Sequence, residues 1–183
     1  MATLKRSVTV SILFTVFGGP GLVLVIVPWL LTRFHVPAGE PVGQIVMAAM
    51  LIAAGAIPLI ESIWRFVQVG RGTLMPAVPT EHLVVSGLYR FVRNPMYVGV
   101  LTALAGETFL LEQQCMVIYW LVVAAIVHLF VVFYEEGTLA RRYGEEFSEF
   151  KKMVPRWLPR LTPWKGMGDD SVTRVGVSPS EPR

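Results

Sequence analysis

Four long apolar runs constrain the fold of this chain more than any other feature, because each approaches the roughly 20 residues with which an α-helix crosses a lipid bilayer. The runs extend from Ser7 to Leu31, from Val42 to Ile60, from about Pro95 to Leu111 and from about Met116 to Tyr134. Only 16% of the 183 residues are charged, whereas soluble domains carry about a quarter. The sequence therefore predicts an all-α integral membrane protein with about four transmembrane helices.

The first apolar run has a second interpretation, because Lys5 and Arg6 precede it as basic residues precede a signal peptide. The run is longer than the apolar part of a signal peptide, and no small-residue cleavage site follows it cleanly. We therefore favour a retained transmembrane helix.

Composition excludes several classes of site. A single cysteine, Cys115, rules out an internal disulfide framework and a cysteine-based zinc cluster. The three histidines, His35, His82 and His128, lie far apart and show no ligand spacing, so no metal site is expected. The net charge of +3 agrees with the orientation of a membrane protein rather than with nucleic-acid binding.

Basic residues are unevenly distributed between the ends of the apolar runs. The loop after the first run carries only Arg33, and the tight hairpin predicted at Glu112-Gln113-Gln114 carries no Lys or Arg. The remaining loop and the two terminal segments hold Lys5, Arg6, Arg65, Arg71, Arg90, Arg93, Arg141, Arg142, Lys151, Lys152, Arg156, Arg160 and Lys165. The positive-inside rule places both termini and the middle loop in the cytoplasm, which in a bacterium means the inner membrane.

The residues after Glu136 follow an amphipathic pattern. Apolar side chains recur every three or four residues, at Leu139, Tyr143, Phe147 and Phe150. This spacing predicts a C-terminal cytoplasmic helix that continues the fourth run and lies on the membrane surface or covers the middle loop. Pro155 ends this helix, and Trp157 and Trp164 suit the membrane interface.

Two polar groups mark one end of the predicted bundle. The stretch from Gly87 to Gly99 is basic and leads into the third run, and Glu135 and Glu136 end the fourth run. A carboxylate is costly within a bilayer and usually faces a protein interior or a cavity. Because neighbouring helical residues point about 100° apart, one glutamate can bind a ligand while the other pairs with an arginine. The competing interpretation is a solvated helix end.

The arginines of the basic stretch also allow two interpretations. Arg90 and Arg93 can extend toward lipid headgroups, or pair with the glutamates and bind a ligand carboxylate bidentately. Asn94 and Pro95 predict a helix start, with Asn94 as N-cap and Pro95 at the first position. The N-terminus of that helix would then face the polar site.

These motifs together resemble those of the isoprenylcysteine carboxyl methyltransferases, a family related to the membrane phospholipid methyltransferases. The resemblance extends from roughly Gly70 to Pro159 and agrees in order and spacing. It rests on Gly87-Leu88-Tyr89, Arg93-Asn94-Pro95-Met96-Tyr97-Val98-Gly99, Glu135-Glu136, Tyr143-Gly144 and Val154-Pro155-Arg156. This chain departs from the family at Leu88, Asn94 and Phe150, where the family has a proline, a histidine and a tyrosine.

The resemblance implies a membrane-embedded methyltransferase that binds S-adenosyl-L-methionine at the cytosolic side of a helical bundle and takes a lipidic acceptor from the bilayer. Carried over by position, the catalytic residues would be Arg93, Asn94, Glu135 and Glu136. The cofactor-binding residues would be Tyr89, Arg93, Asn94, Pro95, Tyr97, Gly99, Glu135 and Glu136. The expected segments are an N-terminal transmembrane helix pair (1–66), a methyltransferase-like core (67–165) and a disordered tail (166–183).

Several functions stay open at this point. A carboxylate acceptor is already ionised, whereas an amine usually needs a base. Asn94 in place of a histidine therefore favours a carboxylate such as that of an isoprenylcysteine-like substrate, or a base such as Glu135 or Glu136. The alternatives are a phospholipid amine N-methyltransferase, an NADPH-dependent membrane reductase and a non-catalytic membrane scaffold.

Overall fold

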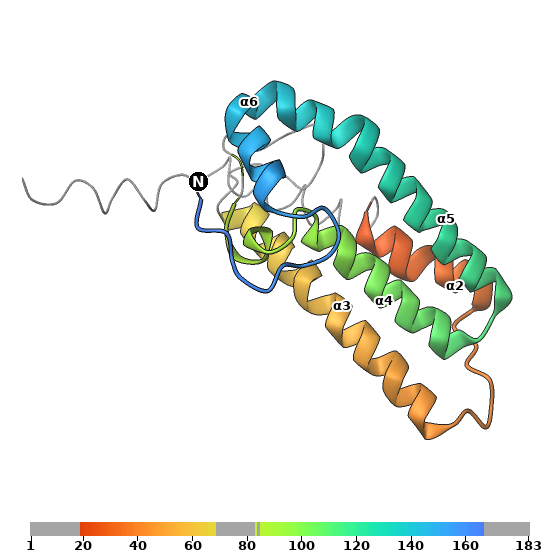
Figure 1. Ribbon diagram of the computed structural model, residues 1–183. Coiled ribbons are helices and arrows are strands. Elements are labelled where there is room, and N and C mark those ends of the chain that lie inside the picture. The colour runs from red at the N-terminus through yellow and green to blue at the C-terminus, as the bar shows by residue number, and fades with distance from the viewer. Residues whose placement is uncertain (1–18, 69–82, 84, 167–183) are drawn as a thin grey trace, which may run out of the picture.

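The computed structural model describes residues 19–68, 83 and 85–166, and within these residues the chain forms helices and no strand (Figure 1). The first helical segment consists of a π-helical turn, Leu22–Ile26, followed by α2, Val27–Thr32. The elements after it are α3 (Val42–Gln68), a 3-10 turn (Gly87–Arg90), α4 (Pro95–Leu111) and α5 (Gln114–Phe130). A second π-helical turn, Val131–Glu135, joins α5 directly to α6, Glu136–Met153. The all-α prediction is confirmed for this part of the chain.

Among the described residues, two helices are long and apolar enough to cross a membrane, Val42–Arg65 and the continuous helix Gln114–Met153. The apolar helix α4 is shorter, at 17 residues, and has the predicted bounds. Most of the first predicted run, before residue 19, lies outside the described residues. The helix that contains the apolar run Val42 to Ile60 continues through Glu61 and Arg65, whose side chains form an ion pair one turn apart.

The helices α3, α4 and α5 run side by side (Figure 1). Between α4 and α5 lies a cluster of buried apolar side chains, formed by Leu104, Leu111, Met116 and Val123. The connection between these two helices is short because Glu112 ends α4 in the left-handed conformation, with φ 48°. The predicted tight hairpin is therefore present.

The helix α6 changes direction at Gly144, which has φ 54° and ψ −120°. Such a backbone conformation is accessible to glycine and strained for other residues. Beyond this kink, Phe147, Phe150, Val154 and Trp164 form a second buried cluster, against which Leu83 and Val85 of the middle loop pack. The tail therefore covers the described part of the middle loop, and Trp164 is buried instead of lying at an interface.

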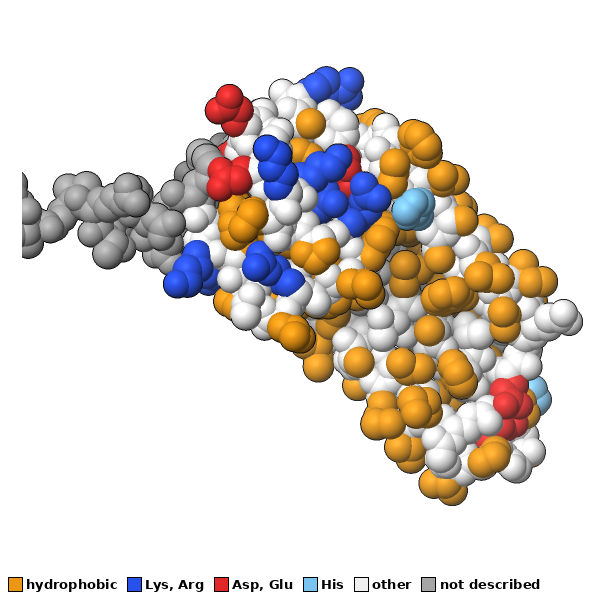
Figure 2. Space-filling view, viewed as in Figure 1, with side chains coloured by type: hydrophobic (Ala, Val, Ile, Leu, Met, Phe, Trp, Pro, Cys, Tyr) orange, Lys and Arg blue, Asp and Glu red, His pale blue; other side chains and the backbone are white. Residues whose placement is uncertain are grey.

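The surface divides into an apolar part and a basic end. In the face shown in Figure 2, hydrophobic side chains cover the length of the helices, and Lys and Arg side chains gather near α6 and the segment after it. Exposed apolar residues such as Ile118, Leu121 and Phe133 lie on the helix that contains α5. This separation is the one that a protein crossing a bilayer needs.

Candidate functional site

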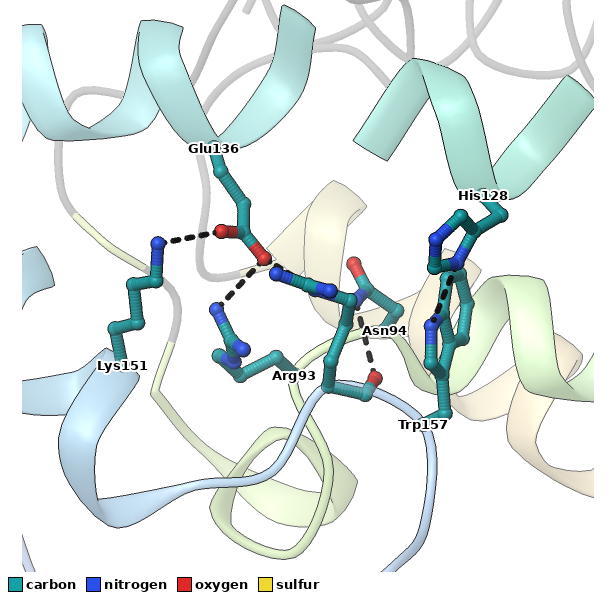
Figure 3. A network of polar contacts seen from close by, with 7 residues as sticks. Arg93, Asn94, His128, Glu136, Lys151 and Trp157 are labelled. Atoms are coloured by element: carbon teal, nitrogen blue, oxygen red, sulfur yellow. Dashed lines mark hydrogen bonds and ion pairs between the residues drawn. The ribbon is translucent and has the colours of Figure 1, made fainter. Parts of the chain in front are cut away.

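A buried carboxylate, Glu136, organises the basic end of the bundle (Figure 3). Its Oε1 lies 2.9 Å from Nη1 of Arg93 and 2.5 Å from Nε of Arg156, and its Oε2 lies 2.7 Å from Nζ of Lys151. The side chains of Glu136 and Arg93 are 8% and 9% exposed. One anion therefore faces three cations, and the cluster keeps an excess of positive charge.

Arg93 has hydrogen-bonding capacity left over. Its Nε is buried and has no hydrogen-bond partner among the described residues. Burial lowers the pKa of the Arg93 guanidinium, and Glu136 acts in the opposite direction. Since a guanidinium stays protonated in proteins, Arg93 offers a donor to an acceptor such as a carboxylate.

The neighbouring Glu135 has different surroundings. It accepts a hydrogen bond from the Tyr97 hydroxyl on α4, while its Oε2 is buried without a hydrogen-bond partner among the described residues. A π-helical turn ends at this residue, and such turns are frequent at functional sites. The two glutamates thus differ as their helical spacing predicts, one engaged with cations and the other retaining a free acceptor atom.

Tyr89 lies on the loop side of the same region. It is buried at 8% exposure in the 3-10 turn Gly87–Arg90. Burial raises the pKa of the Tyr89 hydroxyl, and the charges of Glu135 and Glu61 act in the same direction. Tyr97, through its hydrogen bond, and Tyr89, through its electrostatic interaction, therefore both lie near Glu135.

The segment 154–166 is fastened to the basic loop by backbone hydrogen bonds. The Arg93 N–H donates to the Pro155 carbonyl over 2.9 Å, and the Arg160 N–H donates to the Phe91 carbonyl over 3.0 Å. The Trp164 N–H donates to the Arg90 carbonyl over 2.9 Å, and Nε of Arg90 donates back to the Trp164 carbonyl over 2.6 Å. We call segment 154–166, held in this way, the clasp.

The side chain of Asn94 takes part in this contact. It occupies the N-cap position before Pro95, as predicted, but its side chain forms no capping hydrogen bond. Its Nδ2 instead donates to the Arg156 carbonyl over 3.1 Å. The predicted N-cap position is confirmed, while the side-chain amide of Asn94 binds the clasp instead of capping the helix.

The remaining predicted residues lie deeper in the bundle. Pro95 is buried at the first position of α4. Gly99 lies against α3, where a Cβ atom on it would be 2.6 Å from the Gly55 carbonyl oxygen. Gly99 therefore serves the contact between the two helices, while Arg93, Asn94, Tyr97, Glu135 and Glu136 gather at the polar end.

Several partners in the site escaped the sequence reasoning. Lys151 and Arg156 both bind Glu136, whereas the sequence pattern indicated only their place on the cytoplasmic side and, for Arg156, in the tail motif. Trp157 donates from Nε1 to Nδ1 of His128 over 3.2 Å, with ring centroids 5.9 Å apart (Figure 3). For Arg156, the motif Val154-Pro155-Arg156 was a sequence feature that could have indicated a role in the site. For His128 and Trp157, which are 29 residues apart, no sequence feature indicated that they are in contact.

The site offers groups of both charge signs without a hydrogen-bond partner among the described residues, Nε of Arg93 and Oε2 of Glu135. The cation excess near Arg93 suits an anionic group, and the free Oε2 of Glu135 suits a cation or a hydrogen-bond donor. Within the described residues, no three His, Cys, Asp or Glu side chains are grouped so as to hold a metal ion.

Comparison with known proteins gives two results. The model of the family described as phospholipid methyltransferase matches residues 43–146. Two curated relatives, the protein-S-isoprenylcysteine O-methyltransferases of Mus musculus and Rattus norvegicus, are each 36% identical over 81 residues. The aligned region covers 44% of this chain and 28% of each relative, so the chain matches less than a third of their length.

Proposed function

Because the chain belongs to the phospholipid methyltransferase family, we propose that it transfers a methyl group from S-adenosyl-L-methionine to a lipidic acceptor at the membrane surface. The observation that carries the proposal is the pair of polar atoms left free at the basic end, Nε of Arg93 and Oε2 of Glu135. Both belong to the region that the family model matches.

The chemistry of S-adenosyl-L-methionine fits these atoms. The molecule carries a carboxylate, an ammonium group and a positively charged sulfonium. Arg93 would hold the carboxylate by charge-assisted hydrogen bonds, and Glu135, oriented by Tyr97, would face a positive group. When bound, the cofactor supplies a methyl group that needs no further activation. The protein then contributes position and exclusion of water, which are sufficient to accelerate an in-line transfer.

The roles that we assign to Glu136, Glu135 and Asn94 follow from the ion pairs and hydrogen bonds that each side chain already forms. Glu136 is held by Arg93, Arg156 and Lys151, so we assign it the role of positioning Arg93 and closing the clasp. Glu135 has a free oxygen and is the better candidate for direct ligand contact. Asn94 is engaged with the clasp and would act by holding it in place.

For the acceptor, we favour a carboxylate on an isoprenylcysteine-like lipid. The relatives are named protein-S-isoprenylcysteine O-methyltransferases, and the positive charge around Arg93 attracts an anionic acceptor. A carboxylate also requires no base. The second candidate is a phospholipid amine, which the description of the matching family favours and for which Glu135 would serve as the base.

We also propose that four helices cross the membrane, with both termini and the basic end in the cytoplasm. Two helices of sufficient length and the apolar α4 support this arrangement, as does the gathering of Lys and Arg at one end (Figure 2). The helix α6, with Phe147 and Phe150 buried on one side, would be the cytoplasmic amphipathic helix over the site.

Calorimetric titration of the detergent-purified protein with S-adenosylhomocysteine tests the proposal. We expect the wild type to bind, and Glu135→Gln to weaken binding about tenfold or more through loss of one charged contact. Glu145→Gln, at an exposed position on α6, is the matched control and should bind as the wild type does. A folded wild type that does not bind would refute methyl transfer and favour a scaffold or a reductase. Labelled-methyl transfer to prenylated thiol acids and to phospholipids then separates the two acceptors.

A further inference from the structure

The clasp presents two leucines to its surroundings on the side away from the protein. Leu158 is 79% exposed and Leu161 is 99% exposed, the two highest values among the large hydrophobic residues of the described chain. On the inner side of the same segment, Val154 and Trp164 are buried. Scattered exposed leucines are ordinary on a protein surface, but these two lie within one turn-like segment whose backbone is bonded to the loop 90–93.

The chain segment that carries these leucines has charges of a single sign. Residues 150–166 include Lys151, Lys152, Arg156, Arg160 and Lys165, and no acidic residue. Lys151 and Arg156 are paired with Glu136, and Arg160 donates to the Met153 carbonyl. Lys152 and Lys165 are exposed and have no ion pair among the described residues. The clasp and the last residues of α6 therefore combine free positive charge, at Lys165 and Lys152, with projecting apolar side chains.

We propose that the outer side of the clasp, together with the end of α6 that carries Lys152, docks on the anionic phospholipids of the surrounding bilayer. Leu158 and Leu161 enter the boundary between headgroups and acyl chains, and Lys152 and Lys165 contact the lipid phosphates. Apolar side chains beside lysines are the combination with which surface segments bind anionic membranes. Charge complementarity favours this occupant, since lipid phosphates would provide the anions that Lys152 and Lys165 do not find in an ion pair within the described residues.

Docking has a consequence for the site, because the same segment faces Glu136 on its inner side. Arg156 and the Asn94 contact belong to the clasp. A clasp anchored in lipid on one side and bonded to residues 90–94 on the other is held closed over the polar end. The lipid contact itself does not depend on the proposed methyl transfer, and it can be measured without cofactor.

Quenching of a fluorescent probe by labelled lipids tests this proposal. In a Cys115→Ser background, Leu161→Cys is labelled with bimane, and the full chain is placed in nanodiscs that contain doxyl-labelled phosphatidylglycerol or doxyl-labelled phosphatidylcholine at equal mole fraction. We expect strong quenching that is greater with phosphatidylglycerol. Glu145→Cys, at an exposed position of α6, is the matched control, and bimane attached there should be quenched by neither lipid.

The lysines provide the second measurement. We expect Lys152→Gln and Lys165→Gln each to lower the preference for phosphatidylglycerol by up to about fivefold, the factor that corresponds to one lysine near an anionic surface. Added salt should have the same effect. Equal quenching by the two lipids would overturn the anionic selectivity. Absence of quenching by either labelled lipid would overturn the proposal. It would mean that the outer side of the clasp contacts water, a second copy of the chain or another protein.

Discussion

The α3–α4 interface and the basic end of the bundle are held together by different physical means. Along the interface the two backbones come into contact, because Gly55, Gly99 and Gly106 leave no side chain between them. A Cβ atom on Gly106 would be 2.8 Å from the Ala48 carbonyl oxygen, and one on Gly99 would be 2.6 Å from that of Gly55. Such contacts between small residues are what helices in lipid use, since burial from water does not drive them together there.

At the basic end, by contrast, charge and hydrogen bonds fix the chain. Glu136 connects the loop, through Arg93, with α6 and the clasp, through Lys151 and Arg156. These directed contacts add to the packing of Phe147, Phe150, Val154 and Trp164 in the buried cluster. The difference implies that the helices form a stable frame, whereas the cover of the site depends on the balance around one carboxylate.

The largest effect should come from Glu136→Gln, which removes the anion and leaves three cations facing one another. We expect a loss of about 3 kcal/mol in the free energy of unfolding, near the lower end for breaking a buried pair, because Lys151 and Arg156 are partly screened by water. Hydrogen exchange of the Arg93, Arg160 and Trp164 amides should become faster. Glu146→Gln, exposed on the same helix, is the control. Unchanged exchange in the Glu136 variant would show that the clasp does not depend on charge.

Gly55→Ala tests the α3–α4 interface, and we expect it to lower the free energy of unfolding less than Glu136→Gln does. The added methyl group would overlap the backbone of α4 at Gly99 and Ala103, and such overpacking costs about 2 kcal/mol. Thermal unfolding in detergent should show the loss.

Gly43→Ala is the matched substitution, since it lies in the same helix and a Cβ atom there meets nothing within 4 Å. We expect it to be neutral or slightly stabilising. Equal destabilisation by both variants would mean that close approach of the backbones does not hold α3 against α4.

The helical frame could be predicted from the sequence because its determinants are local. The bounds of α4 follow from Pro95 and from the polar residues that begin at Glu112. The continuation of α5 through Glu135 and Glu136 into a further helix also follows from periodicity. The helix α3 continues beyond the apolar run that ends at Ile60, and the ion pair between Glu61 and Arg65, one turn apart, supports this continuation.

The pairing at the basic end could not be predicted, because it depends on contacts between distant segments. The sequence indicated that one glutamate could pair with an arginine, but gave no means to choose between Glu135 and Glu136. The choice depends on the π-helical turn before Glu136 and on the change of direction at Gly144, after which Arg156 contacts Glu136 of the same helix. Burial of Trp164 against Phe150 has the same origin, with ring centroids 5.5 Å apart.

The smallest effect should come from Trp157→Phe, which sharpens the comparison by removing an uncharged contact at the basic end. The substitution keeps an aromatic ring beside His128 and deletes the N–H that donates to its Nδ1. Because this hydrogen bond is exposed, water can replace it, and we expect a loss of about 0.5 kcal/mol. Hydrogen exchange of the clasp amides should stay near that of the wild type. Faster exchange in Trp157→Phe, to the extent expected for Glu136→Gln, would contradict this prediction. The clasp would then depend on the contact between the indole and the imidazole as much as on Glu136. Charge would in that case no longer distinguish the basic end from the helical frame.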